Sequence, residues 1–370
     1  MVKKIKVLMV VVNLSVANGV SSYVMNYFRA IDHEKIHMDF VVYQDLATPY
    51  YAEIQAKGGR IFVLPSLRNI LLHMKVAEKI IVDGKYDIIH DNILIPSYII
   101  MHYAKKHNIP VRILHSHSSR LSGSKLKAIR NRIFLPFLLN TTTKYVACSK
   151  AAAEGMFGTC NCMIVPNVVS AEKLSFNLDV RSEIRYKMKV EKKLILGSVG
   201  RMAVEKNPIF AIQTVLEAKR TIPNLEYWWI GDGPLMQKVK RFVVANHAEG
   251  YIKLLGNRSD VYRFYQAMDI FFLPSFFEGL PVTGLEAQAA GLPCIVSDTV
   301  SNEFVYTDLV HFFSLSNGVP DVIDAINKIQ SFDCNRDRYE KDLLNSKFSD
   351  QNAGSLLLAT YQRAYKENIR

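Results

Sequence analysis

Two glutamates flank a glycine-containing loop in the run LPSFFEGLPVTGLEAQAAGLPCIVSD, in the second half of the chain. The N–H groups of this loop and of the helix that follows it suit phosphate oxygens, and the loop residues are Gly279, Leu280 and Pro281. Carboxylates repel phosphate, so we expect Glu286 on the helix to bind a ribose diol and Glu278 to accept hydrogen bonds from sugar hydroxyls. The alternative, a helix whose acidic first turn satisfies its own dipole, leaves Glu278 and the loop unexplained.

Two cations follow a predicted strand in the run LILGSVGRMAVEKNP. Arg201 and Lys206 suit a diphosphate, because Gly200 lets the backbone come close to a ligand. A pair of solvated loop charges is the alternative. Gly231 lies in the glycine turn of IGDGPL, which is no dinucleotide fingerprint, because a third glycine at the required spacing is missing.

Histidines end predicted strands in the first half of the chain, at His90 and in the run HSHS, which contains His115 and His117. Alternation along a strand sends His115 and His117 to the same side. A structural role in the core is the alternative for each of them.

Apolar, β-branched runs alternate with segments of helical period along the whole chain. The predicted strands lie at 5–12, 38–43, 60–65, 86–90, 111–115, 144–148, 194–200, 225–233, 251–256, 269–275 and 293–298. Such alternation predicts an α/β fold of parallel sheets with helices on both faces, whose ligands bind at the carboxyl ends of the strands. The pattern restarts after a charged stretch, so we expect two Rossmann-like domains, residues 1–166 and 167–349.

The chain carries a formal charge of +12, part of it in the run SKLKAIRNRIFLPFLLN at 124–140. Its apolar residues recur at helical spacing at Leu126, Ile129, Ile133 and Phe137, its basic residues are Lys125, Lys127, Arg130 and Arg132, and Pro136 is expected to kink or end the helix. Two interpretations stay open: a basic amphipathic helix that binds an anionic membrane, or a surface helix whose apolar stripe packs in the core. Nucleic-acid binding has no support, because helix-turn-helix, zinc-finger and RNA-recognition signatures are missing from the sequence.

Composition places the chain among ordinary globular proteins. No apolar run reaches the roughly 20 residues that span a bilayer, and the apolar N-terminal segment is better explained as a buried strand than as a signal peptide. Five cysteines form no zinc spacing and are expected to be free thiols. We expect a cytoplasmic protein.

The whole chain resembles the GT-B-fold glycosyltransferases of family 4, which are retaining enzymes that use nucleotide sugars. Glu278 and Glu286 have the spacing of the family's paired glutamates, GRMAVEKNP resembles its diphosphate-binding element, and HSHS resembles its histidine-bearing strand end. The resemblance implies two domains facing a cleft, an acceptor domain followed by a donor domain, and a final helix at about 350–370 that packs back onto the first. Within the family, the sequence is most similar to enzymes of capsular and exopolysaccharide synthesis.

The resemblance also implies residue roles. Arg201 and Lys206 would hold the donor diphosphate, Gly19 would bring its amide near it, and His117 would lie by the transferred sugar, with His115 and His90 as secondary candidates. The departures are Asn18-Gly19 in a loop that usually has two glycines, Asn207 at a position where glycine is common, and a hinge at Asn167 without the usual glycine.

The expected reaction is transfer of a sugar, with a UDP-sugar favoured as donor, to a hydroxyl of a saccharide or lipid-linked acceptor at the inner face of a membrane. We expect no cofactor and no metal, because the sequence lacks the Asp-x-Asp triplet that many GT-A enzymes use and its cations would replace the metal. Two alternatives stay open: a same-fold nucleotide-sugar epimerase, and a catalytically idle sugar-nucleotide-binding or membrane-binding partner in a polysaccharide complex.

Overall fold

The computed structural model describes all residues except 1–3, 17, 121–124, 159–160, 331–334 and 369–370. Within the helix at 125–139, the side chains of 125–128 and 130 also lie outside the described part. The chain divides into two compact units, Met1–Asn167 with Asp350–Arg370 (unit 1) and Val168–Ser349 (unit 2). The boundary lies one residue beyond the position expected from the sequence.

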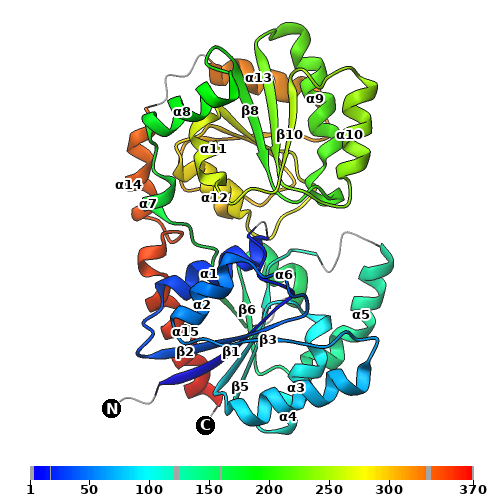
Figure 1. The fold of residues 1–370 in the computed structure, drawn as a ribbon, viewed down its shortest axis with the longest axis vertical. Helices are drawn as coiled ribbons and strands as arrows, with labels where there is room; N and C mark the ends of the chain where they lie inside the picture. Colours follow the sequence, from blue (N-terminus) through cyan, green and yellow to red (C-terminus); the bar gives the residue numbers. More distant parts are fainter. Residues whose placement is uncertain (1–3, 17, 121–124, 159–160, 331–334, 369–370) are drawn as a thin grey trace. The chain divides into compact units, whose positions relative to one another are not determined.

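Unit 1 is built on a sheet of parallel strands in the order β3-β2-β1-β4-β5-β6-β7 (Figure 1). Its elements are β1 (Ile5–Val11), α1 (Gly19–Ala30), β2 (Ile36–Val42), α2 (Pro49–Ala56), β3 (Ile61–Val63), α3 (Ile70–Gly84), β4 (Ile88–Asp91), η1 (Ile95–Ser97), α4 (Tyr98–Lys106), β5 (Val111–Ser116), α5 (Lys125–Leu139), β6 (Lys144–Ala147), α6 (Lys150–Phe157), β7 (Cys162–Ile164), η5 (Asp350–Asn352) and α15 (Ala353–Asn368). Strands and helices alternate along the chain in this unit, as the sequence predicts.

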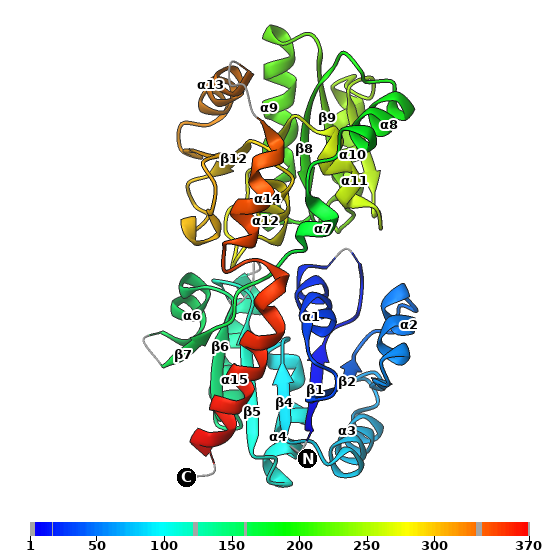
Figure 2. The same ribbon diagram turned by 90° about the vertical axis from the view of Figure 1, so that its left-hand side faces the viewer.

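Helices cover both faces of the sheet in unit 1. A buried cluster joins β1, β2, β4 and β5 to α3, α4 and α5 through side chains such as Leu114, Ile81, Met101 and Leu138. Helix α15 packs against α1 and runs along the sheet beside it (Figure 2). The close approach of these two helices depends on Gly354, because a Cβ there would lie 1.9 Å from the carbonyl oxygen of Ala30.

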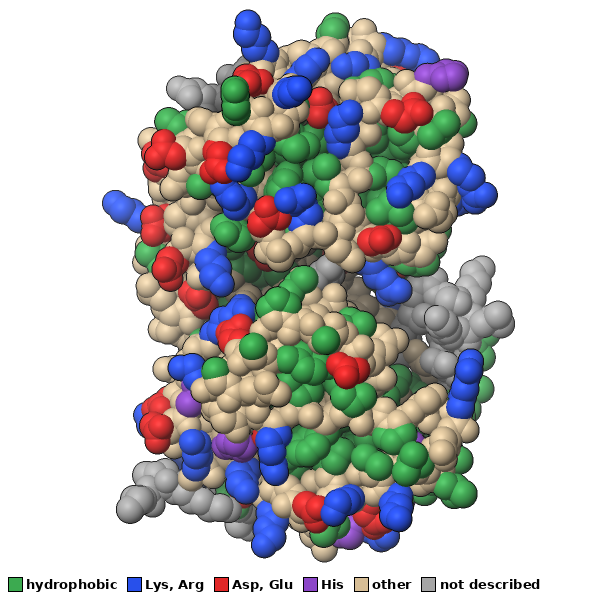
Figure 3. Space-filling model, viewed as in Figure 1, with side chains coloured by type: hydrophobic (Ala, Val, Ile, Leu, Met, Phe, Trp, Pro, Cys, Tyr) green, Lys and Arg blue, Asp and Glu red, His purple; other side chains and the backbone are tan. Residues whose placement is uncertain are grey.

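Unit 1 also carries exposed apolar side chains. Five of them lie at the start of α3 and in the loop before it, at Leu67, Ile70, Leu71, Leu72 and Met74 (the α3 patch). Four more lie on α5, at Ile129, Ile133, Phe134 and Phe137 (the α5 patch). Figure 3 shows apolar side chains gathered over the part of unit 1 where α3 lies in Figure 1.

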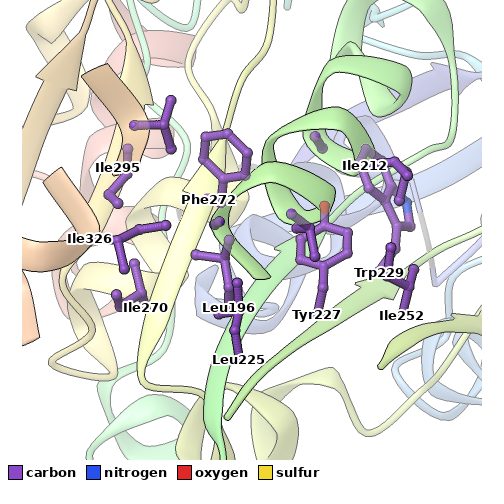
Figure 4. Close-up of a cluster of buried hydrophobic side chains, with 14 of the residues drawn as sticks. Leu196, Ile212, Leu225, Tyr227, Trp229, Ile252, Ile270, Phe272, Ile295 and Ile326 are labelled. Atoms are coloured by element: carbon purple, nitrogen blue, oxygen red, sulfur yellow. The ribbon is translucent and has the colours of Figure 1, made fainter. Parts of the chain in front are cut away.

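Unit 2 repeats this architecture with a sheet of parallel strands in the order β10-β9-β8-β11-β12-β13. Its elements are α7 (Ala171–Leu174), α8 (Leu178–Met188), β8 (Leu194–Val199), η2 (Val204–Lys206), α9 (Pro208–Thr221), β9 (Leu225–Ile230), α10 (Met236–Ala245), β10 (Ile252–Gly256), α11 (Val261–Ala267), β11 (Ile270–Leu273), α12 (Val282–Ala289), β12 (Cys294–Ser297), η3 (Asn302–Phe304), β13 (Val310–Phe313), α13 (Val319–Gln330), η4 (Arg336–Arg338) and α14 (Tyr339–Leu344). Its core packs Tyr227 and Trp229 of β9 and Phe272 of β11 against Ile212 of α9 (Figure 4).

The predicted α/β class with two parallel-sheet, Rossmann-like halves is confirmed. Strands β7 and β13 lie outside the strands predicted from the sequence, and the charged stretch between the two halves contains the helices α7 and α8. Pro136 does not end α5, which continues to Leu139. Asn207 has a φ of 52° and a ψ of 50°, so it occupies the left-handed region that asparagine tolerates better than most residues, which accounts for its presence in place of glycine.

Among the described residues, no helix is long and apolar enough to cross a membrane.

Candidate functional site

At the carboxyl edge of the unit 2 sheet, the cation Lys206 meets the carboxylate Glu278. Lys206 ends η2, which follows β8, and Glu278 lies in the loop after β11. The Lys206 Nζ lies 2.6 Å from the Glu278 Oε1, and Ser275 Oγ donates to the same oxygen at 2.7 Å. Both charged side chains are about 15% exposed, at 16% and 14%. The two groups form a partly buried ion pair, so Lys206 presents a charge that Glu278 already offsets.

Backbone contacts tie the loops of this edge to one another. The N–H of Phe276 donates to the carbonyl of Glu205, which joins the loop after β11 to η2. Gly231, after β9, has a φ of 130°, and a Cβ there would lie 2.1 Å from the carbonyl oxygen of Gly200. Gly200 itself has a φ of 147° and lies against the Lys206 side chain. Both glycines are therefore required by backbone geometry and close packing.

Glu286 lies on α12, the helix that follows the glycine loop. Tyr265 donates its hydroxyl to the Glu286 Oε2 at 2.8 Å. Burial raises the pKa of Glu286 to about 7, although the bond from Tyr265 acts in the opposite direction. At neutral pH the protonated and the ionised form of the Glu286 carboxyl group are therefore both populated.

The remaining predicted residues of unit 2 lie around this edge. Pro281 is the N-cap of α12, Leu280 is buried beside it, and Gly279 belongs to the same loop. Arg201 directly follows Gly200 and is exposed. The structure thus brings Lys206 into contact with Glu278, and it places Arg201 directly after β8 and Glu286 within α12, against Tyr265 of α11.

A second polar cluster lies in unit 1, at the carboxyl ends of β4 and β5. The rings of His115 and His117 stack with centroids 4.1 Å apart, which confirms that the two side chains share one side. His90 lies beneath them, with its Nε2 2.9 Å from the His115 Nδ1 and its Nδ1 2.8 Å from the hydroxyl of Tyr361 on α15. Tyr23 of α1 packs edge-on against His115.

Burial sets the charge state of these histidines. It lowers the pKa of His117 and of His90 to about 3, and it lowers that of His115 well below its usual range. All three rings are therefore neutral at physiological pH.

A pocket of about 300 Å³ opens above this cluster. It is lined by Val12, Asn13, Asn18, Val20, Asn92, Ile93, Leu94, His115, His117 and Ser118. His90 is fully buried and is not part of the lining. Asn18 caps α1 by accepting from the N–H groups of Val20 and Ser21, and Gly19, the first residue of α1, is exposed with open space beside its Cα.

The sequence analysis missed several residues of both clusters. Asn92 and Tyr23 in unit 1, and Ser275 and Tyr265 in unit 2, contact predicted site residues. Only Asn92 had a usable signal, because it is a polar residue two positions after His90 at a strand end.

The basic segment on α5 is only partly described. The side chains of Lys125, Lys127 and Arg130 lie outside the described part, whereas Arg132 is exposed. Ile129, Ile133 and Phe137 are 60%, 61% and 57% exposed. The interpretation in which these apolar residues pack in the core is therefore wrong, and Leu138 is the α5 residue that enters it.

The described residues contain no group of three histidine, cysteine or acidic side chains that could hold a metal ion. Cys148, Cys162 and Cys294 are free thiols, while Cys160 and Cys334 lie outside the described residues.

Comparisons with known proteins match both units. Residues 193–331 match a family model described as glycosyl transferases group 1, and residues 17–173 match one described as glycosyltransferase family 4. The chain is 28% identical over 353 residues to the putative glycosyltransferase EpsF of Bacillus subtilis, with 92% of each chain covered. It is 25% identical over 332 residues to the UDP-Gal:alpha-D-GlcNAc-diphosphoundecaprenol alpha-1,3-galactosyltransferase of Escherichia coli, with 84% of each covered.

Solved structures share the fold at low sequence identity. HepE of Anabaena, in complex with UDP and glucose, has a TM-score of 0.78 at 14% identity, with 97% of this chain and 99% of that chain covered. The sucrose-phosphate synthase of Thermosynechococcus elongatus has a TM-score of 0.79 at 14% identity, with 98% and 100% covered.

The raised pKa of Glu286 predicts a pH-dependent contribution to stability. Folded Glu286 keeps its proton up to a pH of about 7, whereas an unfolded glutamate loses it near 4.5, so the folded state binds more protons in this window and is destabilised as the pH rises through it. We expect the melting temperature of the wild type, relative to Glu286→Gln, to fall between about pH 5 and about pH 8.

The control is Glu249→Gln, at an exposed position of the same unit, which should show no such trend. The raised pKa of Glu286 is contradicted if the difference in melting temperature between the wild type and Glu286→Gln stays constant with pH. It is also contradicted if the wild type gains stability relative to the variant as the pH rises.

Proposed function

Because this chain belongs to glycosyltransferase family 4 and has the GT-B fold, we propose that it transfers a sugar from a UDP-sugar to a hydroxyl of a saccharide or lipid-linked acceptor, with retention of anomeric configuration. The observation that carries the proposal is the contact of Lys206 with Glu278 at the carboxyl edge of the unit 2 sheet, directly before the glycine loop that leads into α12. Two relatives support the donor: the one from E. coli is named for UDP-Gal, and HepE was solved with UDP.

The donor diphosphate would bind at the start of α12. Arg201 is exposed and would supply positive charge, and Lys206 would donate the ammonium hydrogens that Glu278 does not accept. The glycine loop before α12 supplies backbone N–H groups near the positive end of the helix dipole. The loops after β8 and β9 pack directly on each other at Gly200 and Gly231, which fixes their backbones at this edge of the sheet. In unit 1, Gly19 is the exposed first residue of α1, so its amide lies at the positive end of that helix, where an anionic group could bind.

Glu286 and Glu278 would bind the hydroxyl groups of the donor. An ionised Glu286 accepts hydrogen bonds from the ribose diol while Tyr265 holds its second oxygen. Glu278 would hold a sugar hydroxyl, and its pairing with Lys206 fixes the position of the carboxylate before the donor arrives. A charge-assisted bond of this kind contributes about 1.5–3 kcal/mol.

The chemical step breaks the anomeric C–O bond and leaves new negative charge on the nucleoside diphosphate. Arg201, Lys206 and the α12 dipole would stabilise this charge without a bound metal. In unit 1, His117 would orient a sugar hydroxyl in the pocket that it lines. The leaving phosphate would help to deprotonate the acceptor from the same face, which gives retention. This step follows from the family resemblance.

A membrane surface would hold the protein near a lipid-linked acceptor. The α3 and α5 patches belong to helices that cover the same face of the unit 1 sheet, with α4 packed against both. Exposed cations lie next to the patches at Arg68, Lys75 and Arg132. The two acidic residues of α3 are already paired, Glu78 with Lys106 and Asp83 with Lys79. Apolar side chains ringed by net positive charge suit an anionic bilayer.

Donor binding predicts a thermal shift that depends on Glu286. A nucleotide sugar at about 100 times its dissociation constant should stabilise the wild type by about 2.7 kcal/mol in the presence of EDTA. Glu286→Ala should lose most of the shift, since it loses the bond to the ribose, and Glu249→Ala should keep it. If no UDP-, GDP-, ADP- or CMP-sugar stabilises the wild type with EDTA or with added divalent metal, the donor site is wrongly assigned.

Membrane binding predicts co-sedimentation with vesicles of phosphatidylglycerol and phosphatidylcholine that weakens with added salt. Leu71→Ser in the α3 patch and Ile133→Ser in the α5 patch should each lower the partition coefficient by about fivefold or more, because each removes on the order of 1 kcal/mol of apolar burial. Val244→Ser, at an exposed apolar position of unit 2, is the matched control and should bind as the wild type does. If all three variants bind the vesicles as the wild type does, the α3 and α5 patches do not carry membrane binding.

A further inference from the structure

Asn92, which follows β4, has a side chain whose orientation is fixed by its neighbours. It is 5% exposed, and its Nδ2 lies 3.1 Å from the carbonyl oxygen of His90 and 3.3 Å from that of Val10. Carbonyl oxygens only accept hydrogen bonds, so the NH₂ group must face them. The reversed amide would place Oδ1 against two carbonyl oxygens. The amide oxygen therefore points the other way, toward His117.

This orientation determines which ring nitrogen of His117 carries hydrogen. The Asn92 Oδ1 lies 2.9 Å from the His117 Nε2, and an amide oxygen only accepts. His117 must therefore donate from Nε2. Because burial lowers the pKa of His117 to about 3, the ring is neutral and has a single N–H, which leaves a lone pair on Nδ1.

Ring contacts keep His117 in this position. His117 stacks on His115 with centroids 4.1 Å apart, and Tyr23 packs against its ring at 4.7 Å. Among the described residues none hydrogen-bonds to the His117 Nδ1, and this atom is not among the buried polar atoms without a partner. His117 lines the pocket of unit 1, and its Nδ1 lone pair accepts no hydrogen bond from the part of the chain that the structure describes.

We propose that Asn92 is a positioning residue that holds His117 as the Nε2–H tautomer, so that His117 accepts a hydrogen bond at Nδ1 from a hydroxyl of the sugar in the pocket. The sugar as ligand rests on the proposed function, whereas the tautomer does not. Two consequences follow for the chemistry. His117 cannot donate a proton or a hydrogen bond to the ligand from Nδ1, and it holds the sugar through a hydroxyl that donates.

The tautomer is measured directly on the ligand-free protein by long-range ¹H–¹⁵N correlation spectra of ¹⁵N-histidine-labelled protein at neutral pH. His117→Gln assigns the ring signals. We expect His117 as a neutral ring protonated on Nε2. Asn92→Ala removes the acceptor and should give a mixture of both tautomers. A wild-type His117 protonated on Nδ1, or on both nitrogens, overturns the proposal whether or not the variants fold.

Kinetics test whether Asn92 acts through His117. With the donor that the thermal-shift screen identifies, Asn92→Ala should lower kcat about tenfold, the loss expected for one misdirected hydrogen bond, and should change the donor KM less than about twofold. In a His117→Ala background the same substitution should cost nothing further. An equal loss in both backgrounds overturns the positioning role. If the wild type transfers no sugar, the proposed function fails, while the spectra still decide the tautomer.

Discussion

Parallel strand order is the constraint on which both candidate sites depend. In a parallel sheet every strand ends at the same edge, so residues far apart in the sequence meet there without any special contact between their elements. In unit 2 this brings Lys206, which follows β8, to Glu278, which follows β11, across 72 residues. In unit 1 the same constraint brings Asn92 after β4 to His117 after β5. The order of the strands therefore determines which residues meet at each site, and the loops carry their side chains.

Burial then sets the charge of the groups collected at these edges. Desolvation disfavours the charged form, so it raises the pKa of Glu286 and lowers those of the three histidines. Glu278 forms an ion pair with Lys206, so each of the two charges is compensated by the other. Unit 1 thus offers neutral hydrogen-bonding rings and unit 2 offers charge. The neutral rings can exchange hydrogen bonds with hydroxyl groups, and the charged groups can bind hydroxyl groups as well as phosphate.

The sequence predicted the elements whose signals are local. The alternation of strand and helix patterns along the chain predicted the fold class. Short strands such as β7 lack the length to show a pattern. The side-chain partners of the site, such as Tyr265 for Glu286, could not be predicted, because they depend on register and helix rotation. Both interpretations of α5 were compatible with its periodicity, and the exposure of Ile129, Ile133 and Phe137 in the structure excludes the one in which they pack in the core.

The central claim is transfer of a sugar to an acceptor, and the products of one reaction test it most directly. The protein would be incubated in EDTA with the nucleotide sugar that it binds and a polyprenyl-diphosphate-linked monosaccharide, and the products would be identified by mass spectrometry and NMR. The account predicts nucleoside diphosphate and extended acceptor in equal amounts, with the anomeric configuration of the donor retained. An epimerised nucleotide sugar formed without acceptor, an inverted linkage, or no turnover despite donor binding would contradict it.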